Sequence, residues 1–211
     1  AGANAPVVYQ TSFSGNSVID RVMRHVLDTS LFDSTEHGFR QGPLGNDEVA
    51  YDVTGVDIPC GSVMRAPFDT YHTDLDTPEN VLDSNFIEFV SLLGRVISIL
   101  ERNSCLERRF EGLPCLSSPE IDLYLSPPLM SQVKQETLSG NLFSELSPDI
   151  HELVSQRSDK LNYMMNVLPA MCDSSYTILD VAEKTGLPFE LVDLYTDRWA
   201  EKGLLSKNGF T

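Results

Sequence analysis

The feature that most constrains this chain is a long amphipathic segment, Thr77–Arg102, which carries the signals of a capped helix. Thr77 suits the N-cap, Pro78 suits the first helical position, and Glu79 complements the positive end of the helix dipole. One wide apolar face follows, made of Phe86, Phe89, Val90, Leu93, Val96, Ile97 and Leu100. A face of this width is typical of a helix that packs on a sheet, so the sequence predicts a layered α/β structure.

The residues before this segment contain further elements. Ser17–Leu27 has apolar residues at helical spacing, and Thr29–Asn46 is a predicted loop because glycine and proline interrupt it. Val49–Val53 and Val56–Met64 read as two short strands, although Pro59 places part of the second at a sheet edge or in an irregular crossing. The first part of the chain, residues 1–128, is therefore expected to be an α/β domain that ends in a proline-rich irregular stretch.

The C-terminal part has a different, helical pattern. Lys160–Met171, Thr177–Lys184 and Pro188–Lys202 are predicted helices, and Gly203 ends the last one before a short strand. A helix, a turn with glycine, a second helix and a short strand are typical of a helix-turn-helix with a small wing. The sequence thus predicts a linker over 129–158 and a winged-helix domain over 159–211.

Composition excludes several classes of partner. The 211 residues include 15 Lys and Arg against 31 Asp and Glu, a formal net charge of -16. Phosphate and anionic lipid both require clustered basic residues, so we expect neither nucleic-acid nor membrane-surface binding. No apolar run approaches the roughly 20 residues of a membrane span. The four cysteines form no Cys-x-x-Cys pair and no intact signal peptide is seen, which favours reduced thiols and a cytoplasmic location.

One loop stands out chemically. His72, Asp74 and Asp76 alternate just before the long helix, and in an extended strand they would share one face. Imidazole and carboxylate groups are good zinc ligands, so this face is a candidate metal site. The alternative is that the two aspartates cap the helix and His72 hydrogen-bonds a loop carbonyl.

Several motifs in fixed order resemble a known family. They are Gly45-Asn46-Asp47-Glu48, Gly55-Val56-Asp57-Ile58-Pro59, Ser62-Val63-Met64-Arg65 and Tyr71-His72-Thr73. This order is similar to that of bacterial aminopeptidase-like proteins of the domain-of-unknown-function type, relatives of the M28 zinc exopeptidases. Proteins of that family often end in a winged-helix domain, which Gly186-Leu187-Pro188-Phe189 and Gly203-Leu204-Leu205 resemble.

The resemblance implies a role for each matching residue. His72 corresponds to the last zinc ligand, and Tyr71 and Arg65 would line the same cleft and steady the substrate or the developing oxyanion. Glu48 lies in the block that approaches the active site and joins Tyr71 and Arg65 as a catalytic candidate. Val49 and Ala50 replace the arginine and glutamine of the family, which changes the expected substrate contacts.

The resemblance also implies that this chain is one part of an enzyme. The family's His-x-Asp and Glu-Glu ligands and base have no match before Tyr71, and His25, His37 and His151 are expected to be structural. The leading hypothesis is therefore the C-terminal half of a zinc-dependent hydrolase, in which metal-activated water attacks a peptide or amide carbonyl. An N-terminal half or a partner subunit would complete the metal site. A non-catalytic scaffold and an acidic winged-helix regulator are the alternatives.

Overall fold

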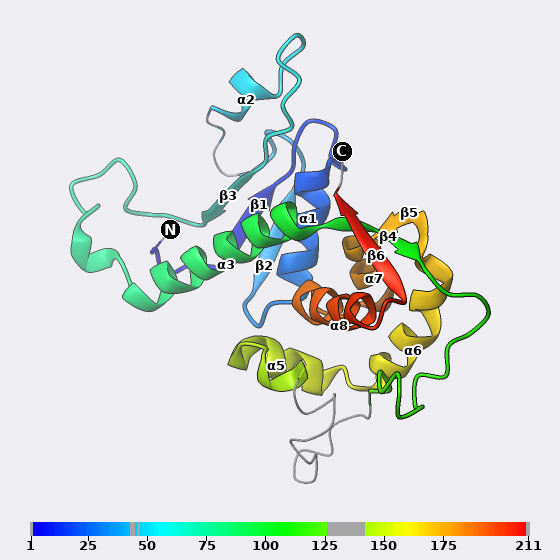
Figure 1. Cartoon of the computed structure of the whole chain (residues 1–211). Helices are drawn as coiled ribbons and strands as arrows, with labels where there is room; N and C mark the ends of the chain where they lie inside the picture. Colours follow the sequence, from blue (N-terminus) through cyan, green and yellow to red (C-terminus); the bar gives the residue numbers. More distant parts are fainter. Residues whose placement is uncertain (1, 43–44, 46, 126–141, 210–211) are drawn as a thin grey trace. The chain divides into compact units, whose positions relative to one another are not determined.

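The computed structural model of the chain describes residues 2–42, 45, 47–125 and 142–209 (Figure 1). It divides into two compact units, Ala1–Leu100 and Glu101–Thr211. The predicted domain boundaries at residues 128 and 158 stay predictions, and part of the predicted linker (126–141) lies outside the described residues. Each unit has its own sheet and its own core.

The first unit is built on a small mixed sheet. Its strands are β1 (Val7–Gln10), β2 (Ser34–His37) and β3 (Ser62–Arg65), in the order β2-β1-β3. β1 is parallel to β2 and antiparallel to β3, and Val8 lies opposite Thr35 on one side and Met64 on the other. All four residues of β1 are buried, so this strand is the centre of the unit. The predicted mixed α/β character is confirmed for this unit.

Helix α1 (Val18–Asp28) connects the two parallel strands and confirms the predicted helix over Ser17–Leu27. A crossover helix is the usual way to join parallel neighbours, because a tight turn cannot do so. Val22, Met23 and Val26 are buried at helical spacing, and Ser17 begins the helix with a capping box. The strands β1 and β2, which flank this helix, were not predicted. In the case of β2, Ser34–His37 is polar and fell within the predicted loop.

The predicted strand over Val49–Val53 is wrong. Glu48–Tyr51 forms a short helix, α2, whose turn is held by hydrogen bonds from Ala50 N to Asp47 O and from Asp52 N to Glu48 O. The side chains of Val49, Tyr51 and Val53 are each more than two-fifths exposed, so the apolar run has no sheet to pack against. Of the second predicted run, only its end forms a strand, β3.

The long predicted helix begins later than its sequence signals suggest. Pro78–Asn80 forms a 3₁₀ turn, η1, and the continuous helix α3 runs over Asp83–Arg102. Between them Val81 is extended, and the amide of Leu82 donates to the carbonyl oxygen of Gly2 at 2.9 Å. The chain therefore leaves the helical path where it pairs with the N-terminal segment.

The second unit joins helices to an antiparallel sheet. Strands β4 (Ser104–Arg108), β5 (Asp173–Thr177) and β6 (Leu205–Gly209) have the order β5-β4-β6. The helices are α5 (Pro148–Gln156), α6 (Asp159–Val167), η2 (Leu168–Met171), α7 (Ile178–Thr185) and α8 (Phe189–Glu201). The predicted helices at 160–171, 177–184 and 188–202 and the strand after them are confirmed. The winged-helix assignment of this unit stays a prediction.

The caps and buried residues of the second unit explain why its helices could be predicted from sequence. Thr177 caps α7 by accepting a hydrogen bond from Asp180 N, and Gly186 ends that helix in the left-handed conformation. Phe189, Tyr195 and Trp199 of α8 are fully buried, so this helix packs into the core of the second unit. No helix among the described residues combines the length and the apolar character needed to cross a bilayer.

Candidate active site

The loop that follows β3 forms a series of tight turns. Backbone amides of Tyr71, Thr73 and Asp76 donate to the carbonyls of Phe68, Thr70 and Thr73 in turn. His72 has a φ of 62°, in the left-handed region that residues other than glycine rarely adopt. The prediction that His72, Asp74 and Asp76 share one face of an extended strand is therefore wrong, because the backbone turns at each step.

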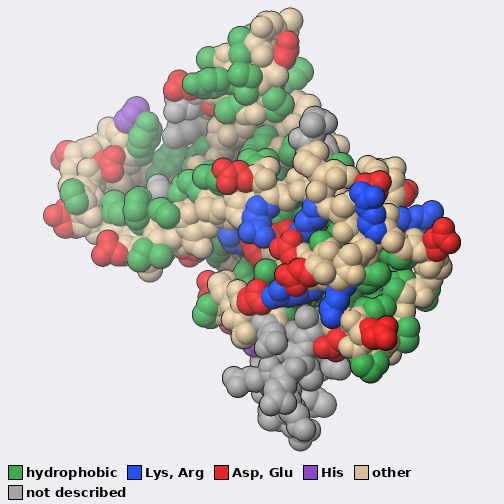
Figure 2. Space-filling model, viewed as in Figure 1, with side chains coloured by type: hydrophobic (Ala, Val, Ile, Leu, Met, Phe, Trp, Pro, Cys, Tyr) green, Lys and Arg blue, Asp and Glu red, His purple; other side chains and the backbone are tan. Residues whose placement is uncertain are grey.

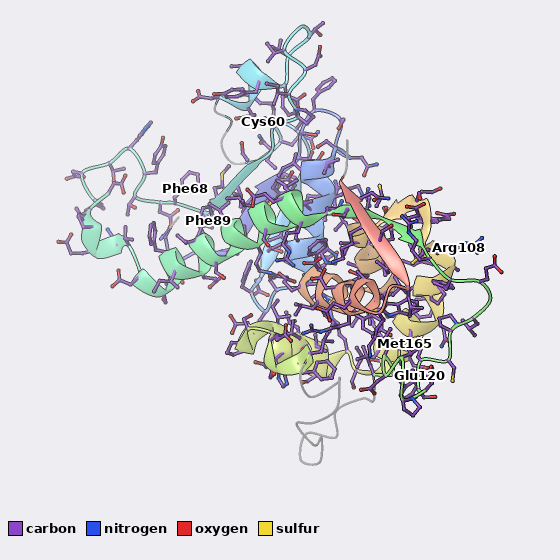
Figure 3. The ribbon with its side chains drawn as sticks, in the orientation of Figure 1. Cys60, Phe68, Phe89, Arg108, Glu120 and Met165 are labelled. Atoms are coloured by element: carbon purple, nitrogen blue, oxygen red, sulfur yellow. The ribbon has the colours of Figure 1, made fainter. Side chains whose placement is uncertain are left out.

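Three rings of this loop form a continuous aromatic contact. The Tyr71 ring stacks on the imidazole of His72, with centroids 3.9 Å apart and planes 20° from parallel. Phe68, labelled in Figure 3 just beyond β3, contacts the Tyr71 ring edge-on, with the ring centroids 5.4 Å apart. Both Tyr71 and His72 remain exposed to solvent. The stack fixes the plane of an accessible imidazole.

A pocket of about 280 Å³ lies beside this stack, inside the first unit. Its lining includes Met64 and Arg65 from β3, Phe68, Tyr71 and Asp76 from the loop, and Asn80 from η1. The pocket thus brings together two of the predicted catalytic residues, Arg65 and Tyr71. Neither His72 nor Glu48 belongs to its lining.

Arg65 is buried at the wall of this pocket and is engaged by its own unit. Its Nη1 donates to the carbonyl oxygen of Ala5 at 2.7 Å, and its Nη2 lies 2.8 Å from Oε1 of Glu88 in α3. The side chain is 6% exposed, and Nε has no hydrogen-bond partner among the described residues. A guanidinium held in this way braces the N-terminal segment, β3 and α3 around the pocket.

Glu48 lies at a different place, where the strands β1 and β3 meet the loop before α2. Its buried carboxylate accepts hydrogen bonds from Gln10 Nε2 at 3.1 Å and Ser62 Oγ at 3.4 Å, and Arg40 Nη1 is 3.4 Å away. Gln10 in turn accepts from the amide of Gly42 at 3.0 Å. The carboxylate therefore organises this end of the sheet.

Cys60, labelled in Figure 3, precedes β3, and its backbone amide donates to Oδ2 of Asp52 at 3.4 Å. Burial raises the pKa of its thiol, and the negative charges of Glu48 and Asp52 raise it further. A raised pKa keeps the sulfur protonated near neutral pH, so it lacks the thiolate that a cysteine nucleophile needs. All four cysteines of the chain are free.

A second buried carboxylate, Asp20, was not identified from sequence. It accepts hydrogen bonds from the Tyr9 hydroxyl at 2.7 Å and from the amides of Ser12 and Ser17 at 2.7 and 2.8 Å. Burial alone would raise its pKa, but hydrogen bonds from Ser12, Ser17 and Tyr9 outweigh that effect and lower it to about 2. The spacing Ser17-x-x-Asp20, which is that of a capping box, is the sequence signal that could have identified this cluster.

The described residues bring few possible metal ligands together. Among the described residues no group of three or more His, Cys, Asp or Glu side chains is placed to hold a metal ion. His37 lies on β2, His25 is buried on α1, and His151 meets Phe143 edge-on at 6.3 Å. His72 therefore belongs to no group of three donors among these residues, whereas a catalytic zinc site as a rule takes three protein ligands. The described residues do not by themselves fit a zinc ion.

Comparison with known proteins finds one family match and one similar structure. Residues 1–103 match the family described as "Domain of unknown function (DUF4910)". The crystal structure of a "putative peptidase" from Clostridium acetobutylicum superimposes with a TM-score of 0.68 at 21% sequence identity. The match covers 98% of this chain but 40% of the clostridial protein. No curated protein is significantly similar in sequence to this chain.

At this level of identity the match shows a common fold. Both units of the chain have counterparts in the clostridial protein, since the match spans nearly the whole chain. The expected peptidase-like fold is therefore confirmed, whereas the relationship to M28 exopeptidases and the site residues Tyr71, Arg65, Glu48 and His72 stay predictions. The chain spans about two-fifths of the protein it resembles.

Proposed function

We propose that this chain is part of a zinc-dependent, aminopeptidase-like hydrolase that cleaves a peptide or amide bond. The observation that carries the proposal is the likeness in fold, over 98% of the chain, to a protein described as a putative peptidase. The pocket beside an accessible imidazole adds support, because it gives a small substrate group a place next to a candidate metal ligand.

The roles we propose follow from where the side chains lie. His72 would provide one metal ligand, since its imidazole is exposed and its plane is fixed by Tyr71. The Tyr71 hydroxyl would act as a donor to the substrate or to a developing negative charge. Arg65 and Glu48 would act as positioning residues, because both are buried and engaged with neighbouring groups.

The remaining zinc ligands would come from sequence outside this chain. The described residues contain no group of three donors for a zinc ion, and 60% of the clostridial protein has no counterpart here. We therefore propose that an N-terminal half or a partner subunit, related to the M28 exopeptidases, completes the site in the cytoplasm. We also assign the second unit as a winged-helix module that serves protein contacts.

The packing of α8 supports protein contacts over nucleic-acid binding. In a DNA-binding helix-turn-helix the second helix offers basic residues to the major groove. Here α8 carries Asp193 and Asp197, both of which bind Lys207, at 2.8 and 2.5 Å. The charge of Lys207 is thus neutralised by α8, the helix that would have to approach the DNA phosphates.

The test is a peptidase assay on the natural protein together with the polypeptide that adjoins or accompanies it. We expect release of p-nitroaniline from aminoacyl substrates, loss of release with 1,10-phenanthroline, and recovery with Zn²⁺. Tyr71→Phe should lower kcat/KM by about 10- to 100-fold while zinc content is unchanged. Tyr163→Phe on α6, with an equally exposed ring, is the matched control and should have no effect.

A different result would favour the scaffold alternative. If the purified assembly binds no zinc and hydrolyses none of these substrates near neutral pH, the hydrolase proposal is wrong. The fold would then serve a non-catalytic assembly role. Salt-sensitive binding of duplex DNA by the same preparation would instead favour the regulator.

A further inference from the structure

Helix α3 has two apolar faces, of which only one is covered. Leu92, Val96 and Ile99 point into the protein and are at most 5% exposed. On another face Phe86, Ile87, Val90 and Ile97 are 51, 67, 52 and 55% exposed, and they recur at helical spacing. Figure 2 shows hydrophobic side chains on the surface along this helix. We call this face, with Gly94, the α3 outer face.

The charged residues of α3 do not protect this face. Between Asp83 and Glu101 the helix carries Glu88 and Arg95 as its charged residues. Glu88 lies 2.8 Å from Arg65, and Arg95 donates to the Thr29 carbonyl at 2.9 Å. Both charged side chains thus contact other residues of the first unit. Neither of them hydrates the outer face. Such an exposed apolar surface marks a contact site.

The outer face is also shaped for close approach of another helix. A Cβ atom added at Gly94 would meet nothing within 4 Å, so the space above it is open. Ser91 and Ser98 lie one turn on either side of Gly94 and are also exposed. Small residues between larger apolar ones let a second helix backbone come near while Val90 and Ile97 pack at its sides.

We infer that the α3 outer face is the docking site for an amphipathic helix from the part of the hydrolase that lies outside this chain. The inference rests on the proposed function. It is supported by the clostridial protein, of which 60% has no counterpart in this chain. Asp83 and Glu101 bracket the face, so the docking helix should carry Lys or Arg near both ends.

A second copy of this chain fits the face less well. Two antiparallel α3 helices would bring Asp83 of one copy toward Glu101 of the other at both ends of the contact. The chain as a whole also carries a net charge of -16, which opposes self-association. The complementary occupant is therefore a different, less acidic polypeptide.

Cysteine accessibility tests this inference. Val90→Cys and Ile97→Cys are made in a background in which the four native cysteines are serine, and maleimide labelling rates are measured. The rates are compared between this chain alone and the natural assembly that contains the adjoining polypeptide. We expect labelling at both positions to be at least about tenfold slower in the assembly. Leu113→Cys, 77% exposed in the second unit, is the matched control and should label equally in both.

The outcomes separate this inference from the proposed function. Equal labelling of Val90→Cys in the assembly and in the chain alone overturns it, even where the assembly hydrolyses peptides. Slow labelling in the chain alone also overturns it if the purified chain has the mass of a dimer, because the occupant of the face is then a second copy. Protection in an assembly that lacks zinc and activity leaves the docking face standing and removes the hydrolase. Gly94→Leu adds an independent check: it should weaken the assembly at least about tenfold and leave the fold of this chain intact.

Discussion

Five donor groups converge on the Asp20 carboxylate at the start of α1, and this single residue links β1, the following loop and the helix. The donors are the Tyr9 hydroxyl and the amides and hydroxyls of Ser12 and Ser17. Asp20 is fully buried, so these bonds are shielded from competing water. The cluster sets the direction in which the crossover helix leaves the sheet.

Removing this carboxylate should strongly destabilise the first unit. Asp20→Ala leaves several buried donors without an acceptor and removes the N3 half of the capping box of α1, at a cost of about 3 kcal/mol in the free energy of unfolding. Urea unfolding followed by circular dichroism measures the change. Asp33→Ala, at an exposed aspartate of the same unit, should stay within about 0.5 kcal/mol of the parent. Equal stability of the two variants would contradict this account of Asp20.

The same residue predicts a dependence of stability on pH. Its folded-state pKa of about 2 lies below the ordinary value of 3.8, so the folded state binds the proton less readily than the unfolded state. The stabilisation, about 2 kcal/mol, is complete above about pH 5 and is lost as the pH falls from about 4 toward 2. The stability difference between the parent and Asp20→Asn should therefore shrink by about 1 kcal/mol between pH 6 and pH 3. A difference that does not change with pH would show that the pKa is not lowered.

At the scale of elements, two glycines with opposite environments allow a paired test. Gly94 is in the middle of α3 with open space around it, so Gly94→Ala should stabilise this chain by about 0.5 to 1 kcal/mol. Gly186 ends α7 with a φ of 65°, so Gly186→Ala should destabilise it by about 1 kcal/mol. Thermal unfolding of the two variants measures both signs. The same sign for both would contradict the assigned helix interior and helix end.

The helices were predictable because their signals are local. The apolar spacing of α1 and the threonine cap and terminal glycine of α7 each lie within a few residues of the element they define. The strands were harder, since β2 is polar and its pairing with β1 depends on residues far away in sequence. The helix α2 was predicted as a strand because its apolar residues, which are exposed, have the pattern of a strand. The hydrogen bonds from Gln10 and Ser62 that hold Glu48 in a buried position come from residues distant in sequence.

The candidate site was predictable only in part for the same reason. The Tyr71-His72 motif identified the loop, but the stacking of the two rings and the turn at His72 depend on φ values that sequence does not reveal. Arg65 was expected to contact substrate, yet its guanidinium is held by Ala5 and Glu88, which lie 60 and 23 residues away in sequence. Long-range contacts of this kind decide which side chains remain accessible.

For the whole molecule, the decisive fact is the relation between this chain and the larger protein it resembles. The chain has two compact units, a fold shared with two-fifths of the clostridial protein, and one accessible imidazole beside a pocket. The exposed apolar face of α3 and the absence of a group of three metal donors among the described residues both agree with the proposal that further polypeptide joins this chain. We therefore propose that the natural assembly is the functional unit.

The most direct test of this account is the zinc content of the natural assembly, measured by inductively coupled plasma mass spectrometry beside His72→Ala and a matched control, His37→Ala on β2. The account predicts bound zinc in the parent and in the His37→Ala assembly, and loss of most of it, at least about tenfold, in the His72→Ala assembly. Zinc that stays bound when His72 is replaced, in an assembly that is otherwise intact, would contradict the central claim.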